Sequence, residues 1–276
     1  PAGSHDQQPL SATKAARIFT GAPLPDGADT VVMQENTLRE GNVVSILTTA
    51  QKGKNVRYRG EDVCEGTDVI PSGAVLRSGE IAMLGALGRP VVQVYRRPHV
   101  ALIPTGNELV EIDVPLKPGQ IPNSNGVMLA SQIESSGARV TRYPIAPDDP
   151  TELARVLEEA AQSADVIITS GGVSVGDFDH VKAVLQDAGT VNFWKVAIKP
   201  GKPLAYGRLR GCPLIGLPGN PVSAFICFEL FARPALRYLS GHSSREHRSM
   251  RARLATSTTQ NKTRREFVRG RLEQRD

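Results

Sequence analysis

The sequence predicts a multidomain α/β-plus-β protein whose central α/β domain is built on a mostly parallel sheet. Two observations predict this class. Apolar strand-like runs alternate with helix-like stretches between residues 98 and 240, and short β-branched runs separated by turn residues fill residues 13–76. The length of 276 residues also suits more than one domain.

The N-terminal part is expected to contain a small β domain. Residues 1–12 have neither an apolar core nor a basic start, so they are not typical of a secretory signal, and we interpret them as a leader or a cloning scar. In residues 13–76 the runs VVMQE, VVSIL and DVIPSG alternate with segments rich in Gly, Asp and Asn. This alternation indicates a barrel-like β domain.

The middle of the chain changes from β to α/β character. Residues 77–97 combine a helical apolar spacing with the run PVVQVYRRP, which predicts a helix and a strand as the remnant of a linking domain. Residues 98–240 contain strands that lead into helices, a hairpin across an Arg-Gly turn and a long helix that starts at Pro221. A mostly parallel sheet with helices on both faces follows from this alternation.

Residues 241–276 predict a partial C-terminal β domain, because about 30 residues cannot bury a core of their own. This tail holds ten of the 33 basic residues of the chain but only four of the 28 acidic ones. The rest of the chain has no positive excess, and aromatic residues make up only 5%. These features argue against a nucleic-acid surface and favour an anionic small molecule.

Composition excludes further classes of protein. No uncharged apolar run is long enough to span a bilayer, so no membrane partner is expected. Cys64, Cys212 and Cys227 are far apart, and no histidine pair has zinc spacing. The sequence therefore predicts structural thiols in a reducing cytoplasm and no zinc site.

Four glycine-rich segments in the predicted α/β domain are candidate anion-binding loops. They are TGNEL (105–109), SGGVSVGDFDH (170–180), IKPGKP (198–203) and GLPGNPVSA (216–224). The carboxyl ends of parallel strands meet at one edge of a sheet, where glycine-rich turns expose backbone N–H groups to anions. We therefore expect the four segments to form one site.

Individual residues in two of these loops suit phosphate or molybdate. Gly171 and Gly172 let the chain leave its strand without Cβ clashes, and Ser174 offers a hydroxyl either to phosphate or to a helix cap. Lys199 and Lys202 place two ammonium groups on a loop stiffened by prolines. A solvated basic loop would have the same composition, so both interpretations stay open here.

The last loop and a set of acidic residues complete the candidate site. Pro218, Asn220 and Pro221 fix a tight turn before a helix, which is either an anion seat or a purely structural turn. Carboxylates recur in loops: Asp62, Glu108, Asp148 and Asp179. Acidic groups beside a phosphate site are typical ligands of Mg²⁺. Taken singly, each could also be a surface charge, and Asp179 could cap the helix that follows it.

Several segments together carry a resemblance to a known family. They are ARIFTGAPLPDGADTVVMQE (16–35), RGEDV (59–63), TGNEL, GQIPNSN (119–125), SGGVSVGDFD, IKPGKP, GLPGNPVSA and RREFVRG (264–270). Over nearly its whole length the chain resembles the molybdopterin molybdenumtransferases of the bacterial MoeA type, which are related to the gephyrin E domain.

The resemblance implies an enzyme that inserts molybdenum from molybdate into adenylylated molybdopterin and releases AMP, with Mg²⁺ as the metal. It implies a homodimer of four-domain subunits, with the cleft between the α/β domain of one subunit and the β domain of the other. The expected catalytic acids are Asp62, Glu108, Asp148 and Asp179, with Glu108 and Asp179 acting on metal or water. The expected substrate-binding residues are Gly171, Gly172, Ser174, Lys199, Lys202, Pro218, Asn220, Pro221, Arg264, Arg265 and Arg269.

Two departures from the family pattern are visible. Asn107 stands where the family's TGDEL segment has an acidic residue, which removes one negative charge near the expected metal. The family's upstream M-D-G-Y-A segment is absent, and the chain stops soon after RREFVRG, so we expect a piece truncated at both ends. The alternative function is a catalytically idle molybdopterin-binding or scaffold module of the same fold. A generic nucleotide-binding phosphotransferase is disfavoured because the chain has no G-x-x-x-x-G-K-[ST] loop.

Overall fold

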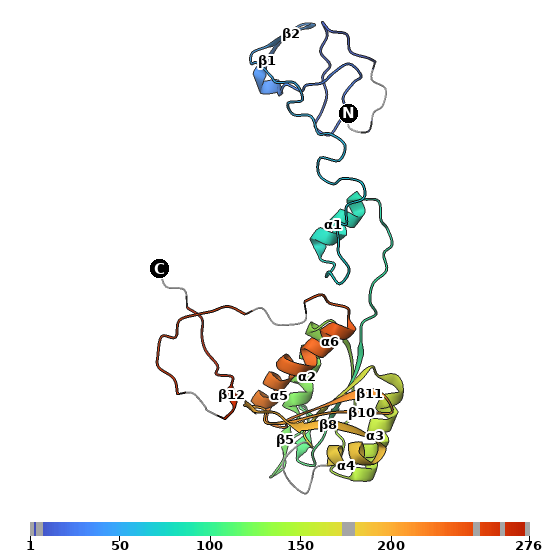
Figure 1. The fold of residues 1–276 in the computed structure, drawn as a ribbon, viewed down its shortest axis with the longest axis vertical. Helices are drawn as coiled ribbons and strands as arrows, with labels where there is room; N and C mark the ends of the chain where they lie inside the picture. The colour runs from blue at the N-terminus through green and yellow to red at the C-terminus, as the bar shows by residue number, and fades with distance from the viewer. Residues whose placement is uncertain (1–2, 4–7, 173–179, 245–248, 260–262, 274–276) are drawn as a thin grey trace. The chain divides into compact units, whose positions relative to one another are not determined.

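The computed structural model describes residues 3, 8–172, 180–244, 249–259 and 263–273 (Figure 1). The chain divides into two compact units, Pro1–Val69 and Ile70–Asp276, and each unit is described by itself. The predicted residues Ser174 and Asp179 lie outside the described residues.

The first unit contains one short hairpin. A 3₁₀ turn, η1 (Gln34–Asn36), leads into β1 (Thr37–Glu40), which pairs with the antiparallel strand β2 (Val43–Ile46). A barrel is not confirmed, because the described residues of this unit form no other strand. The predicted strand at VVMQE ends in η1, and DVIPSG forms turns, since neither run finds a neighbouring strand with which to pair its backbone.

The second unit begins with a segment that leads to the sheet. Helix α1 (Ser78–Ala86) forms as predicted, and its Glu80 carboxylate accepts a hydrogen bond from the Arg77 backbone N–H at 2.9 Å. The strand predicted at residues 90–98 is wrong, because this stretch has no regular structure. Its β-branched residues stay exposed, with Val91 at 85%, and no strand among the described residues pairs with it.

A six-stranded sheet forms the centre of the second unit, as the sequence predicts. The strands are β3 (His99–Pro104), β6 (Arg139–Arg142), β7 (Val166–Ser170), β8 (Gly189–Lys195), β10 (Pro203–Leu209) and β11 (Cys212–Leu217). Their order is β6-β3-β7-β11-β10-β8. The first four are mutually parallel, and β10 runs antiparallel to both of its neighbours. The hairpin β10–β11 turns at Arg210 and Gly211, which both have positive φ.

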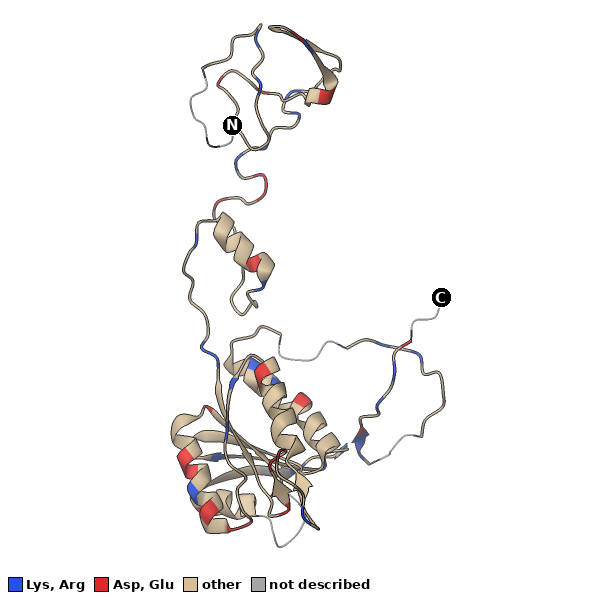
Figure 2. Cartoon of the chain, turned by 180° about the vertical axis from the view of Figure 1, so that it is seen from behind, with Lys and Arg blue, Asp and Glu red and all other residues tan. Residues whose placement is uncertain are grey.

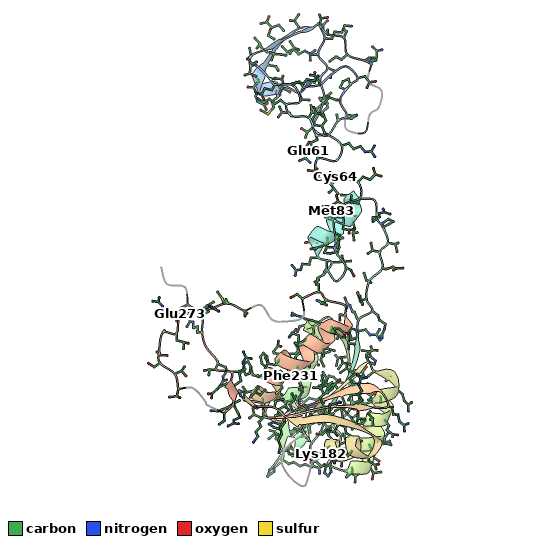
Figure 3. All side chains as sticks on the ribbon, in the orientation of Figure 1. Glu61, Cys64, Met83, Lys182, Phe231 and Glu273 are labelled. Carbon is green, nitrogen blue, oxygen red and sulfur yellow. The ribbon has the colours of Figure 1, made fainter. Side chains whose placement is uncertain are left out.

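Helices cover both faces of this sheet, because alternate residues of each strand point to opposite sides. From β3, Val100 and Leu102 join a core cluster with α2 (Ser124–Ser135) and the C-terminal helical segment, whereas Ala101 and Ile103 join a cluster with the other two helices. Those two helices are α3 (Pro150–Ser163) and α4 (His180–Ala188). Figure 1 shows helices on both sides of the sheet, and Figure 3 adds their side chains.

An ion pair joins the starts of two central strands. The Arg96 guanidinium donates from Nη1 and Nη2 to the two carboxylate oxygens of Asp165, both at 2.7 Å, and Asp165 also accepts from the His99 backbone N–H at 2.7 Å. The hydrogen bonds from Arg96 are the main reason why the pKa of Asp165 lies below its usual value. The pair therefore ties the residue before β7 to the first residue of β3.

The predicted long helix at residues 221–239 is interrupted. It consists of α5 (Pro221–Cys227), a π-helical turn η2 (Phe228–Ala232) and α6 (Arg233–Leu239). Pro234 explains the interruption, because a proline has no N–H to donate and its ring clashes with the carbonyl four residues earlier. The wider turn before it accommodates that clash.

Two short strand pairs lie outside the main sheet. β4 (Leu109–Val110) pairs with β5 (Ile121–Pro122), and β9 (Ile198–Lys199) pairs with β12 (Arg265–Glu266), both in parallel. β12 is the one strand among the described residues of the predicted C-terminal β domain. Figure 2 shows the basic residues along this C-terminal segment. Of the helices formed by described residues, none combines the length and the hydropathy needed to cross a bilayer.

Candidate functional site

The predicted loops gather at one edge of the central sheet. β3, β7 and β11 are parallel, so the turns that begin at Thr105, Gly171 and Pro218 leave the same edge. β10 runs antiparallel to β11 and β8, so the start of β10 and the end of β8 at Lys195 lie at that edge too. The described parts of the four loops therefore start at one edge of the sheet, which we call the rim, and their role as one anion site stays a prediction.

Backbone hydrogen bonds hold the first two turns of the rim together. The Thr105 N–H donates to the Ser170 carbonyl at 2.9 Å, and the Gly171 N–H donates to the Leu217 carbonyl at 3.1 Å. Gly171 has a φ of 94°, and a Cβ atom there would lie 2.5 Å from the Thr105 carbonyl oxygen. Only glycine fits this position. The turn at Gly171 therefore packs directly against the Thr105 backbone, with no room for a side chain between them.

The turn after β11 is fixed by a cap. Asn220 precedes α5, and its side-chain Oδ1 accepts hydrogen bonds from the backbone N–H groups of Val222 at 3.1 Å and Ser223 at 3.2 Å. Pro221 occupies the first position of the helix, where its missing N–H is not needed. In this structure the Asn220 oxygen thus has a structural role, and its predicted contact with substrate stays a prediction.

Basic side chains surround a cavity of about 550 Å³ at the rim. Its lining includes Lys195, Lys202 and Arg264, of which the last belongs to the C-terminal segment. Arg264 comes here because β12, which follows it directly, pairs with β9 of the IKPGKP loop. Lys195 was missed by sequence reasoning. The signal for it is its position as the last residue of an apolar strand beside that loop.

The other predicted basic residues have mixed surroundings. Lys199 forms an ion pair with Glu266, with Nζ 2.7 Å from the carboxylate oxygen, so an anion would compete with this partner. The Arg265 guanidinium lies over the Phe267 ring, 6.0 Å from its centroid, and Arg269 is exposed. The structure therefore brings Lys202 and Arg264 to one cavity, and no such cavity is described for the other three.

A buried cysteine lies beneath the IKPGKP loop and contacts its glycine. The peptide bond between Lys199 and Pro200 is cis. The Cys227 thiol donates to the Gly201 carbonyl at 3.5 Å from beneath the loop. Burial raises the pKa of Cys227 to about 12, so its sulfur stays a neutral thiol. This contact explains why the loop has a glycine here, since a Cβ atom on Gly201 would collide with the sulfur.

Two of the predicted acidic residues, Glu108 and Asp148, lie on loops that are hydrogen-bonded to one another. The Asn107 backbone N–H donates to the Asp148 carboxylate at 3.2 Å, and the Asp148 N–H donates back to the Asn107 side-chain oxygen at 3.1 Å. Glu108 follows Asn107 directly, and its carboxylate folds back over Gly106. Asp62 belongs to the first unit, where it pairs with Arg57 at 2.6 Å.

The part of the chain that the structure describes holds no cluster of three side chains suited to a metal ion. Glu108 and Asp148 nevertheless come from loops joined by the reciprocal bonds of Asn107. Their carboxylate oxygens are the donor type that Mg²⁺ prefers. The donor type of these two side chains is therefore suitable, and the magnesium site itself stays a prediction.

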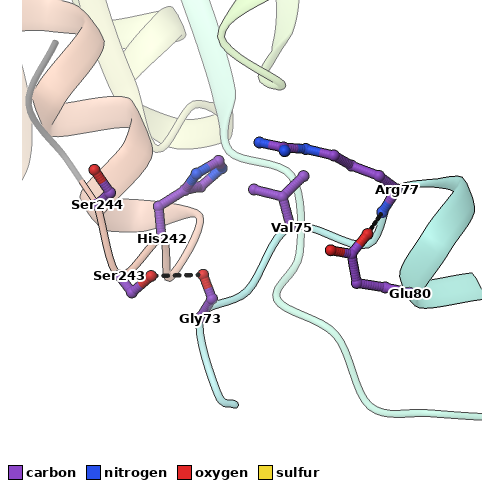
Figure 4. Close-up of a pocket in the computed structure, with 7 residues that line it drawn as sticks. All are labelled: Gly73, Val75, Arg77, Glu80, His242, Ser243 and Ser244. Atoms are coloured by element: carbon purple, nitrogen blue, oxygen red, sulfur yellow. Dashed lines mark hydrogen bonds between the residues drawn. The ribbon is translucent and has the colours of Figure 1, made fainter. Parts of the chain in front are cut away.

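A smaller cavity of about 190 Å³ lies away from the rim (Figure 4). Gly73, Arg77 and His242 line it, and the Ser243 hydroxyl donates to the Gly73 carbonyl at 3.3 Å. It is open, and none of the predicted site residues lines it. It therefore adds nothing to the candidate site.

Comparison with known proteins places the fold and the rim in a family. Residues 101–238 match the family described as a probable molybdopterin binding domain, and residues 1–88 match the MoeA N-terminal region, domains I and II. A molybdopterin molybdenumtransferase of Nostoc is 44% identical over 245 residues, which are 87% of this chain and 56% of that relative. Molybdopterin molybdenumtransferase 2 of Mycobacterium tuberculosis is 41% identical over 281 residues, covering 99% of this chain and 69% of the relative.

A solved structure agrees with these relatives. The crystal structure of the molybdopterin biosynthesis MoeA protein of Pyrococcus horikoshii has a TM-score of 0.76 and 36% sequence identity, over 88% of this chain and 61% of that one. This chain spans 56% of the length of the Nostoc relative, so it corresponds to just over half of that protein. Sequence, family match and fold agree: the chain belongs to the MoeA family of molybdopterin molybdenumtransferases.

Proposed function

We propose that this chain takes part in inserting molybdenum from molybdate into adenylylated molybdopterin, with release of AMP. The observation that carries the proposal is the basic cavity at the rim, which Lys195, Lys202 and Arg264 line. Adenylylated molybdopterin contains a pyrophosphate and molybdate is an oxyanion, so both ligands need cationic side chains and backbone N–H donors. Family membership makes this chemistry the expected one for such a cavity.

The residues take distinct roles in this proposal. Lys202 and Arg264 bind the anionic part of the substrate, and Lys199 joins them when its contact with Glu266 opens. Glu108, Asp148 and Asp179 would hold Mg²⁺, which supplies positive charge to the pyrophosphate as its bond breaks. Asp62, which lies in the first unit, stays a predicted catalytic acid. We also propose that the active form is a homodimer.

The test measures molybdenum insertion by the full-length protein with adenylylated molybdopterin, molybdate and Mg²⁺. Lys202→Ala and Asp179→Ala should each lower the rate at least about 100-fold, because each removes a charge that acts on the transition state. Lys52→Ala is the control, because this lysine of the first unit has an 83% exposed side chain and should leave the rate unchanged.

Two outcomes decide between the enzyme and the scaffold. Unchanged turnover in both site variants would contradict the proposed roles. Tight binding of adenylylated molybdopterin by the wild-type protein without AMP release would indicate the catalytically idle binding module instead. Calorimetry with the same ligand measures that binding directly.

A further inference from the structure

One side chain of α2 connects two turns of the rim. Asn125 is the second residue of the helix, and its Nδ2 group donates to the Ser170 hydroxyl oxygen at 2.9 Å and to the Gly219 carbonyl at 2.7 Å. Ser170 is the last residue of β7, directly before Gly171, and Gly219 lies in the turn after β11. The same amide therefore reaches both turns.

The orientation of this amide follows from its partners. The Gly219 carbonyl can only accept a hydrogen bond, so the NH₂ group of Asn125 and not its oxygen must face it. The opposite flip would place two acceptor oxygens 2.7 Å apart. The Asn125 oxygen is then buried, and no donor among the described residues reaches it. A buried acceptor without a partner destabilises the fold, so the two donated bonds must offset that cost.

The contact lies where the ladder between the two strands ends. β7 and β11 pair as far as Ser170 and Leu217, and the last backbone bond joins Gly171 to Leu217. Beyond that point no backbone hydrogen bond joins the described residues of the two turns. Asn125 supplies the next polar link, because it holds Gly219 against the end of β7.

We propose that Asn125 is a positioning residue that fixes the spacing between the turn after β7 and the turn after β11. Both turns belong to the rim to which the proposed function assigns the anion, so Asn125 sets the affinity of the rim through their spacing, without touching the ligand. The identity of that ligand rests on the proposed function. The role of Asn125 in fixing the spacing between the two turns does not depend on the proposed function.

The variants separate this role from simple stability. Asn125→Asp keeps the shape of the side chain but replaces the donor with an oxygen that opposes the Gly219 carbonyl, and Asn125→Ala removes the link without adding charge. Gln132→Ala is the matched control, since Gln132 is another amide of α2 that donates to Glu229 at 2.7 Å. It lies about two helical turns from Asn125, so its loss should weaken the fold but not the rim.

The first measurement is amide hydrogen exchange of the intact chain by mass spectrometry, without ligand. Both Asn125 variants should exchange at least about tenfold faster in the peptides that contain Gly171–Gly172 and Gly219–Ser223, because local opening is no longer opposed by the link. The Gln132→Ala protein should keep wild-type exchange in these peptides. Unchanged exchange in both turns of Asn125→Asp would overturn the proposal.

The second measurement is calorimetric titration with AMP. Asn125→Ala, which adds no charge, should bind AMP at least about tenfold more weakly than the wild type, and Gln132→Ala should bind it normally even if its melting temperature falls. Equal AMP affinity of Asn125→Ala and wild type would show that Asn125 does not control the affinity of the rim. If the wild type binds no AMP, the proposed function fails, while the exchange data alone still decide whether Asn125 fixes the two turns.

Discussion

At the scale of single residues, burial separates three cysteines that look alike in the sequence. Cys64 is exposed in the first unit, whereas Cys212 and Cys227 are buried in the second. Burial is the largest cause that raises the pKa of both buried thiols, to about 12 for Cys227. Since the thiolate is the reactive form, both burial and this pKa protect the two inner sulfurs.

We therefore expect a thiol reagent such as DTNB at pH 8 to label one cysteine of the native chain quickly and the other two only after unfolding. Replacing Cys64 with Ser should abolish the fast phase. The measurement is the absorbance of the released thiolate with and without guanidinium. Fast labelling of two or three thiols in the folded protein would contradict the burial of the sulfurs.

The residue scale also explains which site contacts sequence reasoning could reach. Lys202 stands in a glycine- and proline-rich motif, so its type and spacing indicate an anion loop. Lys195 lies outside the quoted motifs, and Asn125 ends the GQIPNSN segment, whose composition does not assign it a role. Their relevance comes from where a strand ends and which helix faces the rim, and both depend on contacts between segments far apart in the chain.

At the scale of elements, the C-terminal helical segment is attached to α2 by a half-buried polar network. The Arg233 guanidinium donates to both carboxylate oxygens of Glu229, at 2.6 and 2.7 Å, with 12% and 17% of the two side chains exposed. Glu229 also accepts from Gln132, and Arg233 donates to the Ser135 hydroxyl at 3.3 Å. The network thus spans the π-helical turn and holds it against α2.

Arg233→Ala should lower the free energy of unfolding by about 3 kcal/mol or more, because it leaves the Glu229 carboxylate largely buried without its cation. Arg155→Ala is the control, since its pair with Glu152 on α3 is exposed and should contribute less than about 1 kcal/mol. Urea unfolding followed by circular dichroism measures both changes. Equal, small losses would show that the carboxylate is hydrated or has another partner.

At the scale of the whole molecule, apolar burial is concentrated in the α/β part of the second unit. Both core clusters draw their buried members from residues 100–236. In the first unit, β2 has no buried residue, and the large apolar side chains of Val43 and Ile46 are exposed. The two units therefore differ in what stabilises them, since hydrophobic burial is the main favourable term of folding.

We expect hydrogen exchange to divide the chain along the same line. Amides of β3, β7 and β11 should exchange slowest, through global unfolding, whereas those of β1 and β2 should exchange through local opening at least about 100-fold faster. Native-state exchange with mass spectrometry measures both groups in one sample. Equal protection of β1 and β7 would mean that another surface covers the hairpin.

The sequence by itself determined the α/β centre, the succession of its strands and helices along the chain, and the motifs of the rim. These features are local: apolar period, capping residues and glycine turns act within about ten residues of one another. A local pattern did not suffice to predict an element where the folded chain offered that segment no neighbouring strand. Among the described residues, the run at 90–98 has strand composition but no neighbouring strand, and the predicted β domain forms one hairpin. Pro234 interrupted the expected single helix.

Only the tertiary structure decided how the rim is completed. The parallel register of β3, β7 and β11 brings three turns to one edge, the pairing of β9 with β12 brings Arg264 beside Lys202, and Asn125 joins two turns from a separate helix. Each contact joins residues more than 40 positions apart, as with Asn125 and Gly219, which are 94 apart. The physical reason is that strand pairing and helix packing set these distances, whereas the sequence pattern sets only which residues are available to meet.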